Sequence, residues 1–163
     1  MVKIAVLGYG TVGSGVVEVM ERNNAEVCRR AGEEIAVKYI LDLRDFPGDP
    51  YEDRIIHDFI AILEDKEVSI VCEAMGGVGA AYQFTKQALE AGKSVCTSNK
   101  ELVAKHGAEL HAIAAKMHCN YMFEASVGGG IPIIRTINSA LTADRIEKVT
   151  GILNGTTNYI LTK

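Results

Sequence analysis

The most informative segment of this chain is Lys3-Ile4-Ala5-Val6-Leu7-Gly8-Tyr9-Gly10-Thr11-Val12-Gly13. Only apolar residues follow Lys3 up to Leu7, as expected of a parallel strand that is covered on both faces. The segment from Gly8 to Gly13 fits the pattern G-x-G-x-x-G, and apolar residues at helical spacing continue from Val12 to Met20. A strand, this glycine pattern and a helix in direct succession are typical of a dinucleotide-binding turn.

Each glycine of this turn has its own physical role. Gly8 permits the tight turn after the strand, and Gly10 lets the backbone approach a pyrophosphate. Gly13 lets the helix pack closely against the strand. Thr11 and Val12 open the helix, where unpaired N–H groups and the positive end of the helix dipole face the phosphates. The alternative is a glycine-rich turn without a ligand, which the flanking strand and helix disfavour.

Strand-like and helix-like segments alternate along the rest of the chain. This alternation predicts a Rossmann-like α/β fold, a doubly wound parallel sheet with helices on both faces. Strands are expected at 3–7, 35–41, 68–73, 94–97, 120–123 and near 148–153. Helices are expected over 11–22, 56–63, 80–88, 102–117 and near 132–141. The polar stretch 21–34 is interpreted as a helix end followed by a solvated loop.

The composition is that of an ordinary globular domain. The chain has 163 residues, of which 48% are hydrophobic and 23% charged, with a net charge of −4. Charges of both signs are mixed and aromatics make up 6%, which argues against a nucleic-acid partner. No apolar run approaches the roughly 20 residues that cross a bilayer, and the first strand starts too early for a signal peptide. A cytoplasmic protein with reduced, structural thiols is expected from the spacing of Cys28, Cys72, Cys96 and Cys119.

Two residues after the second expected strand bear on the choice of coenzyme. Asp42 is placed to accept a hydrogen bond from the ribose 2′-hydroxyl of NAD. It lies further beyond Gly13 than the usual spacing of about 20 residues, and the polar insertion at 21–34 explains the excess. Arg44 is suited instead to the 2′-phosphate of NADP, or is a solvated loop arginine. The sequence favours NAD slightly.

Five segments, taken in order, resemble the homoserine dehydrogenase family. The two more general ones are Leu7 to Val17 and Val71-Cys72-Glu73-Ala74-Met75-Gly76-Gly77. The family-specific ones are Thr97-Ser98-Asn99-Lys100-Glu101-Leu102-Val103-Ala104, Phe123-Glu124-Ala125-Ser126-Val127-Gly128-Gly129-Gly130-Ile131-Pro132-Ile133 and Gly151-Ile152-Leu153-Asn154-Gly155-Thr156-Thr157-Asn158-Tyr159-Ile160-Leu161. The resemblance implies a cytoplasmic, homodimeric oxidoreductase of threonine, methionine and isoleucine biosynthesis. Its reaction would be the NAD(P)-dependent interconversion of aspartate 4-semialdehyde and homoserine.

The resemblance also implies that coenzyme and substrate are bound by different domains of the enzyme. We expect residues 1–150 to form the NAD(P)-binding domain and residues 151–163 to begin the substrate domain. In this family the lysine and aspartate that handle the proton lie in the substrate domain, after the segment 154–158. Gly155 and Thr156 are expected to contact the amino-acid end of the substrate. We therefore expect this fragment to bind coenzyme but to be inactive alone.

The resemblance assigns further residues to the nicotinamide end of the site. Met75 and Gly76 are expected to pass under the nicotinamide, where a glycine allows close approach. Ser98 and Lys100 follow the fourth strand at the carboxyl edge of the sheet. Lys100 resembles an auxiliary catalytic lysine that binds the substrate's carboxylate or polarises its carbonyl. The alternatives are an ordinary strand-to-helix turn and a solvated lysine.

The segment from Glu124 to Ile131 resembles a monovalent-cation loop. Glycine-rich backbone can direct several carbonyl oxygens at one hard cation. Sodium is the expected ion, and its expected ligands are the backbone carbonyls of Glu124, Val127, Gly129 and Ile131. The alternative is a tight turn that binds nothing.

Two other functions fit the same fold. One is a stand-alone dinucleotide-binding or sensing module. The other is a different amino-acid-pathway oxidoreductase, such as a semialdehyde or dihydrodipicolinate-type reductase. The latter would need a nucleophilic cysteine motif or a histidine–lysine pair, and the chain shows neither. No metal-ligand spacing is present among His57, His106, His111 and His118.

Overall fold

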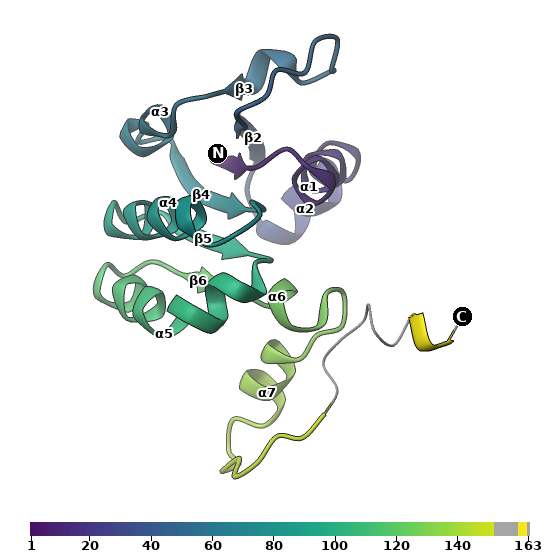
Figure 1. The fold of residues 1–163 in the computed structure, drawn as a ribbon, viewed down its shortest axis with the longest axis vertical. Helices are drawn as coiled ribbons and strands as arrows, with labels where there is room; N and C mark the ends of the chain where they lie inside the picture. Colours follow the sequence, from purple (N-terminus) through teal and green to yellow (C-terminus); the bar gives the residue numbers. More distant parts are fainter. Residues whose placement is uncertain (152–159, 163) are drawn as a thin grey trace.

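The computed structural model describes residues 1–151 and 160–162 of the chain (Figure 1). Over these residues, six strands form one parallel sheet in the order β3-β2-β1-β4-β5-β6. The strands are β1 (Val2–Leu7), β2 (Ile35–Leu41), β3 (Ile55–Ile56), β4 (Val68–Glu73), β5 (Ser94–Thr97) and β6 (Tyr121–Met122). The strand order reverses between β1 and β4, and ligands bind outside the carboxyl ends of such strands.

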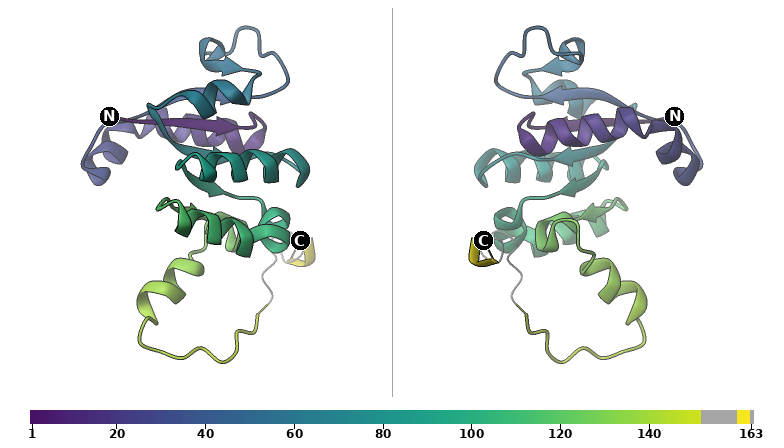
Figure 2. Two further views of the ribbon diagram at one scale, coloured as in Figure 1. Left: turned by 90° about the vertical axis from the view of Figure 1, so that its left-hand side faces the viewer. Right: turned by 90° about the vertical axis from the view of Figure 1, so that its right-hand side faces the viewer.

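Helices cover both faces of the sheet, as Figures 1 and 2 show. One face carries α1 (Thr11–Arg22) and α2 (Asn24–Ala31). The other face carries α3 (Phe59–Glu64), α4 (Gly79–Glu90) and α5 (Lys100–Lys116). Buried side chains of β1 alternate between the two layers, because Val6 packs with Val17 of α1 and Leu7 belongs to the larger cluster under α4 and α5. The predicted doubly wound fold is confirmed.

Several predicted boundaries are confirmed to the residue. The predicted strands 35–41, 68–73 and 94–97 match β2, β4 and β5, and the predicted helix 11–22 matches α1. These segments carry short apolar runs bounded by polar residues or, in α1, a clear helical period, so local sequence is sufficient to define them. The four cysteines are free, partly buried thiols.

The interpretation of 21–34 as a helix end and loop is wrong, because α2 occupies most of it. This helix is mostly polar and buries none of its residues fully, so few apolar positions mark it in the sequence. Glu26 pairs instead with Arg29 and Arg30 on the next turn, at 2.7 and 2.6 Å. Asn24 ties the helix to the sheet by donating to the carbonyl of Ile35 at 2.8 Å.

Two other expectations need correction. The predicted helix 56–63 begins only at Phe59, as α3, whose first turn is capped by the Asp58 carboxylate at 2.9 Å from the amide of Ile60. Ile56 belongs instead to β3, which a 3₁₀ turn, η1 (Glu52–Arg54), precedes. The predicted strand near 148–153 is not formed over 148–151, which are exposed and have no strand partner among the described residues. Residues 152 and 153 lie outside the described part.

After β6 the chain forms α6 (Ala125–Gly128) and α7 (Ile134–Ala140) and extends away from the sheet (Figure 2). From Gly129 to Gly151 no residue is buried. The core that positions the site is therefore complete before this segment, Gly129 to Gly151, which is called the arm below. Among the described helices, none combines the length and the apolar character needed to cross a membrane.

Candidate dinucleotide-binding site

The glycine turn lies where β1 delivers the chain to the carboxyl edge of the sheet. Gly8 has a φ of +92°, and a Cβ there would lie 3.0 Å from the carbonyl oxygen of Ala74. A Cβ on Gly13 would lie 1.7 Å from the carbonyl oxygen of Gly8, so any side chain would push α1 off the strand. A Cβ on Gly10 would meet no atom within 4 Å. Gly8 and Gly13 are thus required by the fold, whereas Gly10 faces open space.

Helix α1 presents its amino end to this open space. Gly10 is its N-cap and supplies no side-chain hydrogen bond, and the first turn has no acidic residue. The N–H groups of Thr11, Val12 and Gly13 are among the donors that a helix leaves unpaired at its start. An anion is therefore stabilised here both by these donors and by the helix dipole.

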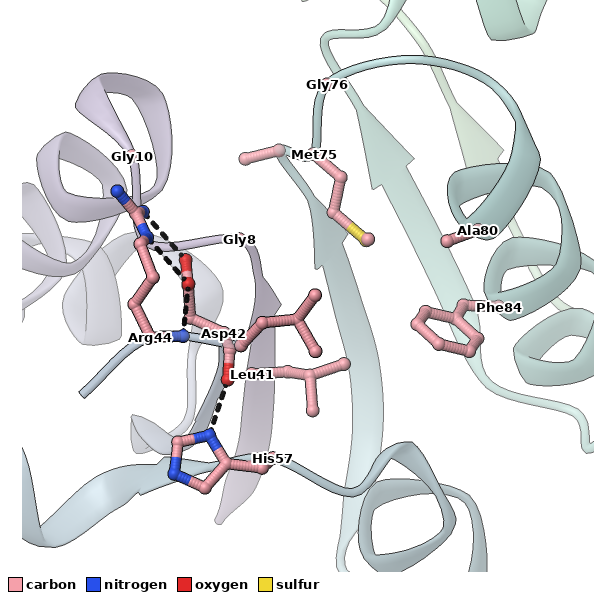
Figure 3. Close-up of a pocket in the computed structure, with 12 residues that line it drawn as sticks. Gly8, Gly10, Leu41, Asp42, Arg44, His57, Met75, Gly76, Ala80 and Phe84 are labelled. Carbon is pink, nitrogen blue, oxygen red and sulfur yellow. Dashed lines mark hydrogen bonds and ion pairs between the residues drawn. The ribbon is translucent and has the colours of Figure 1, made fainter.

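A cavity of about 460 Å³ opens beside the turn, between β2 and α4 (Figure 3). This volume lies in the range of pockets that hold small ligands and cofactors. The cavity is lined by Gly8, Gly10, Leu41, Asp42, Leu43, Arg44, His57, Ala74, Met75, Gly76, Ala80 and Phe84.

The cavity brings together six of the eleven predicted coenzyme residues. Those on its wall are Gly8, Gly10, Asp42, Arg44, Met75 and Gly76. Thr11, Val12 and Gly13 lie in the opening turn of α1, directly after Gly10. Ser98 and Lys100 do not line the cavity and follow β5, the strand next to β4. Lys100 is exposed as the first residue of α5.

Asp42 is held by a network of charged and backbone groups (Figure 3). Its Oδ2 accepts a hydrogen bond from the amide of Tyr9 at 2.8 Å, and its Oδ1 accepts from Nε of Arg44 at 2.9 Å. Nη2 of Arg44 lies 3.0 Å from Oδ2. The Arg44 guanidinium holds the pKa of Asp42 far below its usual range, against the opposing effect of burial. Nδ1 of His57 lies 2.7 Å from the Asp42 carbonyl oxygen.

The two partners of this ion pair differ in exposure. The side chain of Asp42 is 10% exposed, whereas that of Arg44 is 63% exposed. The carboxylate is therefore a fixed negative charge, and the guanidinium is the partner that a ligand can displace or recruit. The arginine also lies 5.0 Å above the ring of Phe46.

Sequence reasoning missed the role of Tyr9. Its side chain is buried, packs edge-on against Phe46 with centroids 5.0 Å apart, and donates its hydroxyl to Asp49 at 3.1 Å. Burial, together with the Asp49 carboxylate, raises the pKa of Tyr9 to about 12. Tyr9 thereby anchors the glycine turn to the loop after β2. The only hint in the sequence was a large aromatic residue at a variable position of the pattern.

The predicted cation loop contains a helical turn, α6, in place of an open loop. The amide of Val127 donates to the Glu124 carbonyl at 3.2 Å, and the Glu124 carboxylate accepts from the amides of Ile133, Ile134 and Arg135 at 2.5 to 2.9 Å. Burial opposes the charged form of Glu124, yet these amides keep its pKa below its usual value. The carboxylate therefore caps α7. The predicted substrate residues Gly155 and Thr156 lie outside the described residues.

Carboxylate, thiol and imidazole groups are not gathered for a metal in the described part of the chain. No group of three or more such side chains is placed to hold an ion there. This finding concerns side chains and leaves the carbonyl ligands predicted for sodium untested.

A parallel sheet of this strand order, a glycine turn that opens α1 and a cavity at the reversal point define a Rossmann-type dinucleotide-binding domain. The chain matches the family model "Homoserine dehydrogenase, NAD binding domain" over residues 8–124 and the model "Homoserine dehydrogenase" over residues 132–163. It belongs to the homoserine dehydrogenase family. The two family matches therefore argue against the alternative of a semialdehyde or dihydrodipicolinate-type reductase on the same fold.

Individual relatives agree with this assignment. The homoserine dehydrogenase of Pseudomonas aeruginosa is 42% identical over 99% of this chain and 38% of its own length. That of Lactococcus lactis is 40% identical over 99% of this chain and 39% of its own length. The crystal structure of a homoserine dehydrogenase from Thiobacillus denitrificans superposes with a TM-score of 0.88 at 41% identity, covering 98% of this chain and 38% of that one. The chain thus spans less than two fifths of these relatives.

A hyperthermophilic archaeal homoserine dehydrogenase in complex with NADPH is also similar. Its TM-score is 0.68 at 26% identity, and the match covers 84% of this chain and 48% of that chain.

Proposed function

We propose that this chain is the coenzyme-binding part of a homoserine dehydrogenase and binds NAD(H) and NADP(H). The observation that carries the proposal is the cavity that joins the open glycine turn to the Asp42–Arg44 pair. The pyrophosphate would lie against the amides of Thr11 to Gly13. The adenosine would enter the apolar wall of the cavity, which includes Leu41 and Phe84.

The proposed reaction interconverts homoserine and aspartate 4-semialdehyde. The bound coenzyme supplies a hydride acceptor or donor. Met75 and Gly76 would support the nicotinamide, and the exposed ammonium of Lys100 would bind the substrate's carboxylate or polarise its carbonyl. The groups that move the proton are expected in the part of the relatives that this chain does not span. We therefore propose that the chain binds coenzyme without measurable turnover of homoserine.

For the choice of coenzyme, we propose a preference for NAD(H) with NADP(H) also accepted. The Asp42 carboxylate is a fixed acceptor for a ribose 2′-hydroxyl. A 2′-phosphate would lie beside this negative charge and would have to draw Arg44 away from it. The archaeal relative with bound NADPH makes the second coenzyme worth testing.

Four assignments continue as proposals on the family resemblance. Residues 1–150 would form the coenzyme domain and 151–163 would begin the substrate domain, with Gly155 and Thr156 at the substrate.

The carbonyls around α6 would hold sodium, tested by comparing thermal stability in NaCl and LiCl. The whole enzyme would be a cytoplasmic homodimer, consistent with the exposed apolar residues of the arm, Ile131, Leu141, Ile146 and Val149.

Titration calorimetry with NADH, NADPH and ADP-ribose tests the proposed function. We expect saturable binding of all three, tighter for NADH than for NADPH, and competition between ADP-ribose and NADH. Absence of saturable binding by any of them would refute the coenzyme role. Tighter binding of NADPH would refute only the proposed preference.

A further inference from the structure

Two loops leave adjacent strands at the proposed nicotinamide end of the site, and of these only the loop after β4 lines the cavity. The loop after β4 contains Met75 and Gly76, and the loop after β5 leads to Lys100. The last residues of these strands, Glu73 and Thr97, are register partners in the sheet. Both are buried, at 1% and 4% exposure, which is unusual for a carboxylate.

A closed set of hydrogen bonds links the two loops through these residues. The Thr97 hydroxyl donates to one carboxylate oxygen of Glu73, and the amide of Met75 donates to the other at 2.7 Å. The amide of Asn99 donates to the Thr97 hydroxyl at 2.9 Å. The Asn99 side chain then donates back to the carbonyl of Gly77 at 2.6 Å. One buried carboxylate thus connects the backbone of both loops.

The same set extends to the start of α5. Oδ1 of Asn99 accepts from the amide of Leu102 at 3.0 Å and caps the helix whose first residue is Lys100. A change in the position of Asn99 would therefore move Lys100 as well as the loop after β4.

The energetics of Glu73 argue against a role in stability alone. Its carboxylate forms no ion pair with any residue in the described ranges, and burial raises the pKa of Glu73 above its usual value. The donors from Thr97, Met75 and Asn99 oppose this effect. A buried carboxylate costs free energy that an apolar residue of similar volume would not. What the carboxylate adds in return is a defined geometry of the two loops.

We propose that Glu73 is a positioning residue that, through Thr97 and Asn99, fixes the loop after β4 against the loop after β5. It thereby sets the backbone that faces the nicotinamide and the position of Lys100. The inference rests on the proposed coenzyme function and concerns the nicotinamide end alone. The Asp42–Arg44 pair lies on the other side of β1 and is not part of the hydrogen-bond set.

Substitutions at Thr97 test the proposal, because they alter the set without removing the carboxylate. Thr97→Val keeps the shape but loses the hydroxyl, and Thr97→Ser keeps the hydroxyl. Calorimetry with NADH and with ADP-ribose, which lacks nicotinamide, separates the two ends of the cavity. For Thr97→Val we expect about tenfold weaker NADH binding and ADP-ribose affinity within about twofold of wild type. Thr97→Ser should restore NADH binding.

Two further variants control for general destabilisation. Thr85→Val makes the same chemical change in α4, at a buried hydroxyl that has no hydrogen-bond partner among the described residues, and should leave both affinities unchanged. Glu73→Gln retains an acceptor for Met75 but offers an amide to the Thr97 hydroxyl, and should show the same selective loss as Thr97→Val. Thermal melting verifies that each variant is folded.

The outcomes distinguish failure of the positioning role of Glu73 from failure of the proposed coenzyme function. Unchanged NADH affinity in Thr97→Val, or an equal loss of NADH and ADP-ribose, would overturn the positioning role while the coenzyme function stands. A wild-type chain that binds neither ligand would overturn the proposed function and this inference with it.

Discussion

At the β1–β2 end of the site the glycine turn and the Arg44 side chain are open to a ligand, whereas at the β4–β5 end the side chains of Glu73 and Thr97 are bonded to the protein itself. Gly10 faces open space and the Arg44 side chain is 63% exposed. Glu73 and Thr97 are almost completely buried. The first end is suited to recognising charge, which requires groups that can exchange partners. The second end is suited to holding backbone in place, which requires groups that cannot.

The largest expected effect separates two glycines within the first end. Gly13→Ala should destabilise the fold by about 3 kcal/mol, because its Cβ would overlap the Gly8 carbonyl and overpacking of this kind is costly. Chemical denaturation measures the change. Gly15→Ala is the matched control, since a Cβ at Gly15 meets nothing within 4 Å and alanine favours the helix. Equal stability of the two variants would contradict the close approach of α1 to β1.

Gly10→Val should abolish coenzyme binding without affecting the fold. Its side chain would occupy the space proposed for the pyrophosphate, and its Cβ would meet no atom of the described residues within 4 Å. We expect at least about a hundredfold loss of NADH affinity, equivalent to about 2.7 kcal/mol, with an unchanged melting temperature. Gly15→Val in the same helix should bind NADH normally. Retained affinity in Gly10→Val would place the phosphates elsewhere.

Substitutions at the ion pair should change coenzyme selectivity. Arg44→Ala should weaken the binding of NADPH about tenfold and that of NADH much less, because a charge-assisted contact to the 2′-phosphate is lost. Asp42→Ala should weaken the binding of NADH about tenfold and so reduce the preference for NADH over NADPH. Arg22→Ala, which removes an exposed arginine paired with Glu18 on α1, is the control. Parallel losses for both coenzymes would mean that the pair does not read the ribose.

The two ends should respond to pH in opposite directions. The folded-state pKa of Asp42 is lowered, so its contribution to stability is present above the ordinary value of 3.8 and is lost as the pH falls below it. The pKa of Glu73 is raised, so its charge costs stability as the pH rises above the ordinary value of 4.5. Asp42→Asn should therefore lose less stability in acid than wild type, and Glu73→Gln should gain relative to wild type as the pH rises.

Denaturation curves at several pH values measure both trends. A Glu73→Gln variant whose relative stability falls as the pH rises would contradict the burial of an unpaired charge.

The smallest expected effect is that of Thr85→Val, which serves as the control for Thr97→Val. Thr85→Val should raise the free energy of unfolding by up to about 1 kcal/mol, because a methyl group replaces a buried hydroxyl that finds no partner in the described part of the chain. Thermal or chemical denaturation checks this gain. A loss of stability would indicate a partner for Thr85 and would remove it as a control for Thr97.

Sequence reasoning predicted the first end of the cavity better than the second. Asp42 and Arg44 follow a long apolar strand at a recognisable distance from the glycine turn, so their place at the sheet edge could be inferred. Tyr9 and Glu73 were not identified, because their partners Asp49 and Thr97 lie far away in the sequence. No local pattern indicates which distant residue a hydroxyl or carboxylate will meet.

Local sequence is sufficient to predict the strand, turn and helix from Val2 to Arg22 and the strands β2, β4 and β5. Their causes are local, namely glycine sterics and apolar runs that must be buried on both faces. Two features could be seen only in the folded chain: Ile55–Ile56 extends the sheet, and Glu73 meets Thr97. These features depend on the register of neighbouring parallel strands and on surfaces that exist only after the chain has folded.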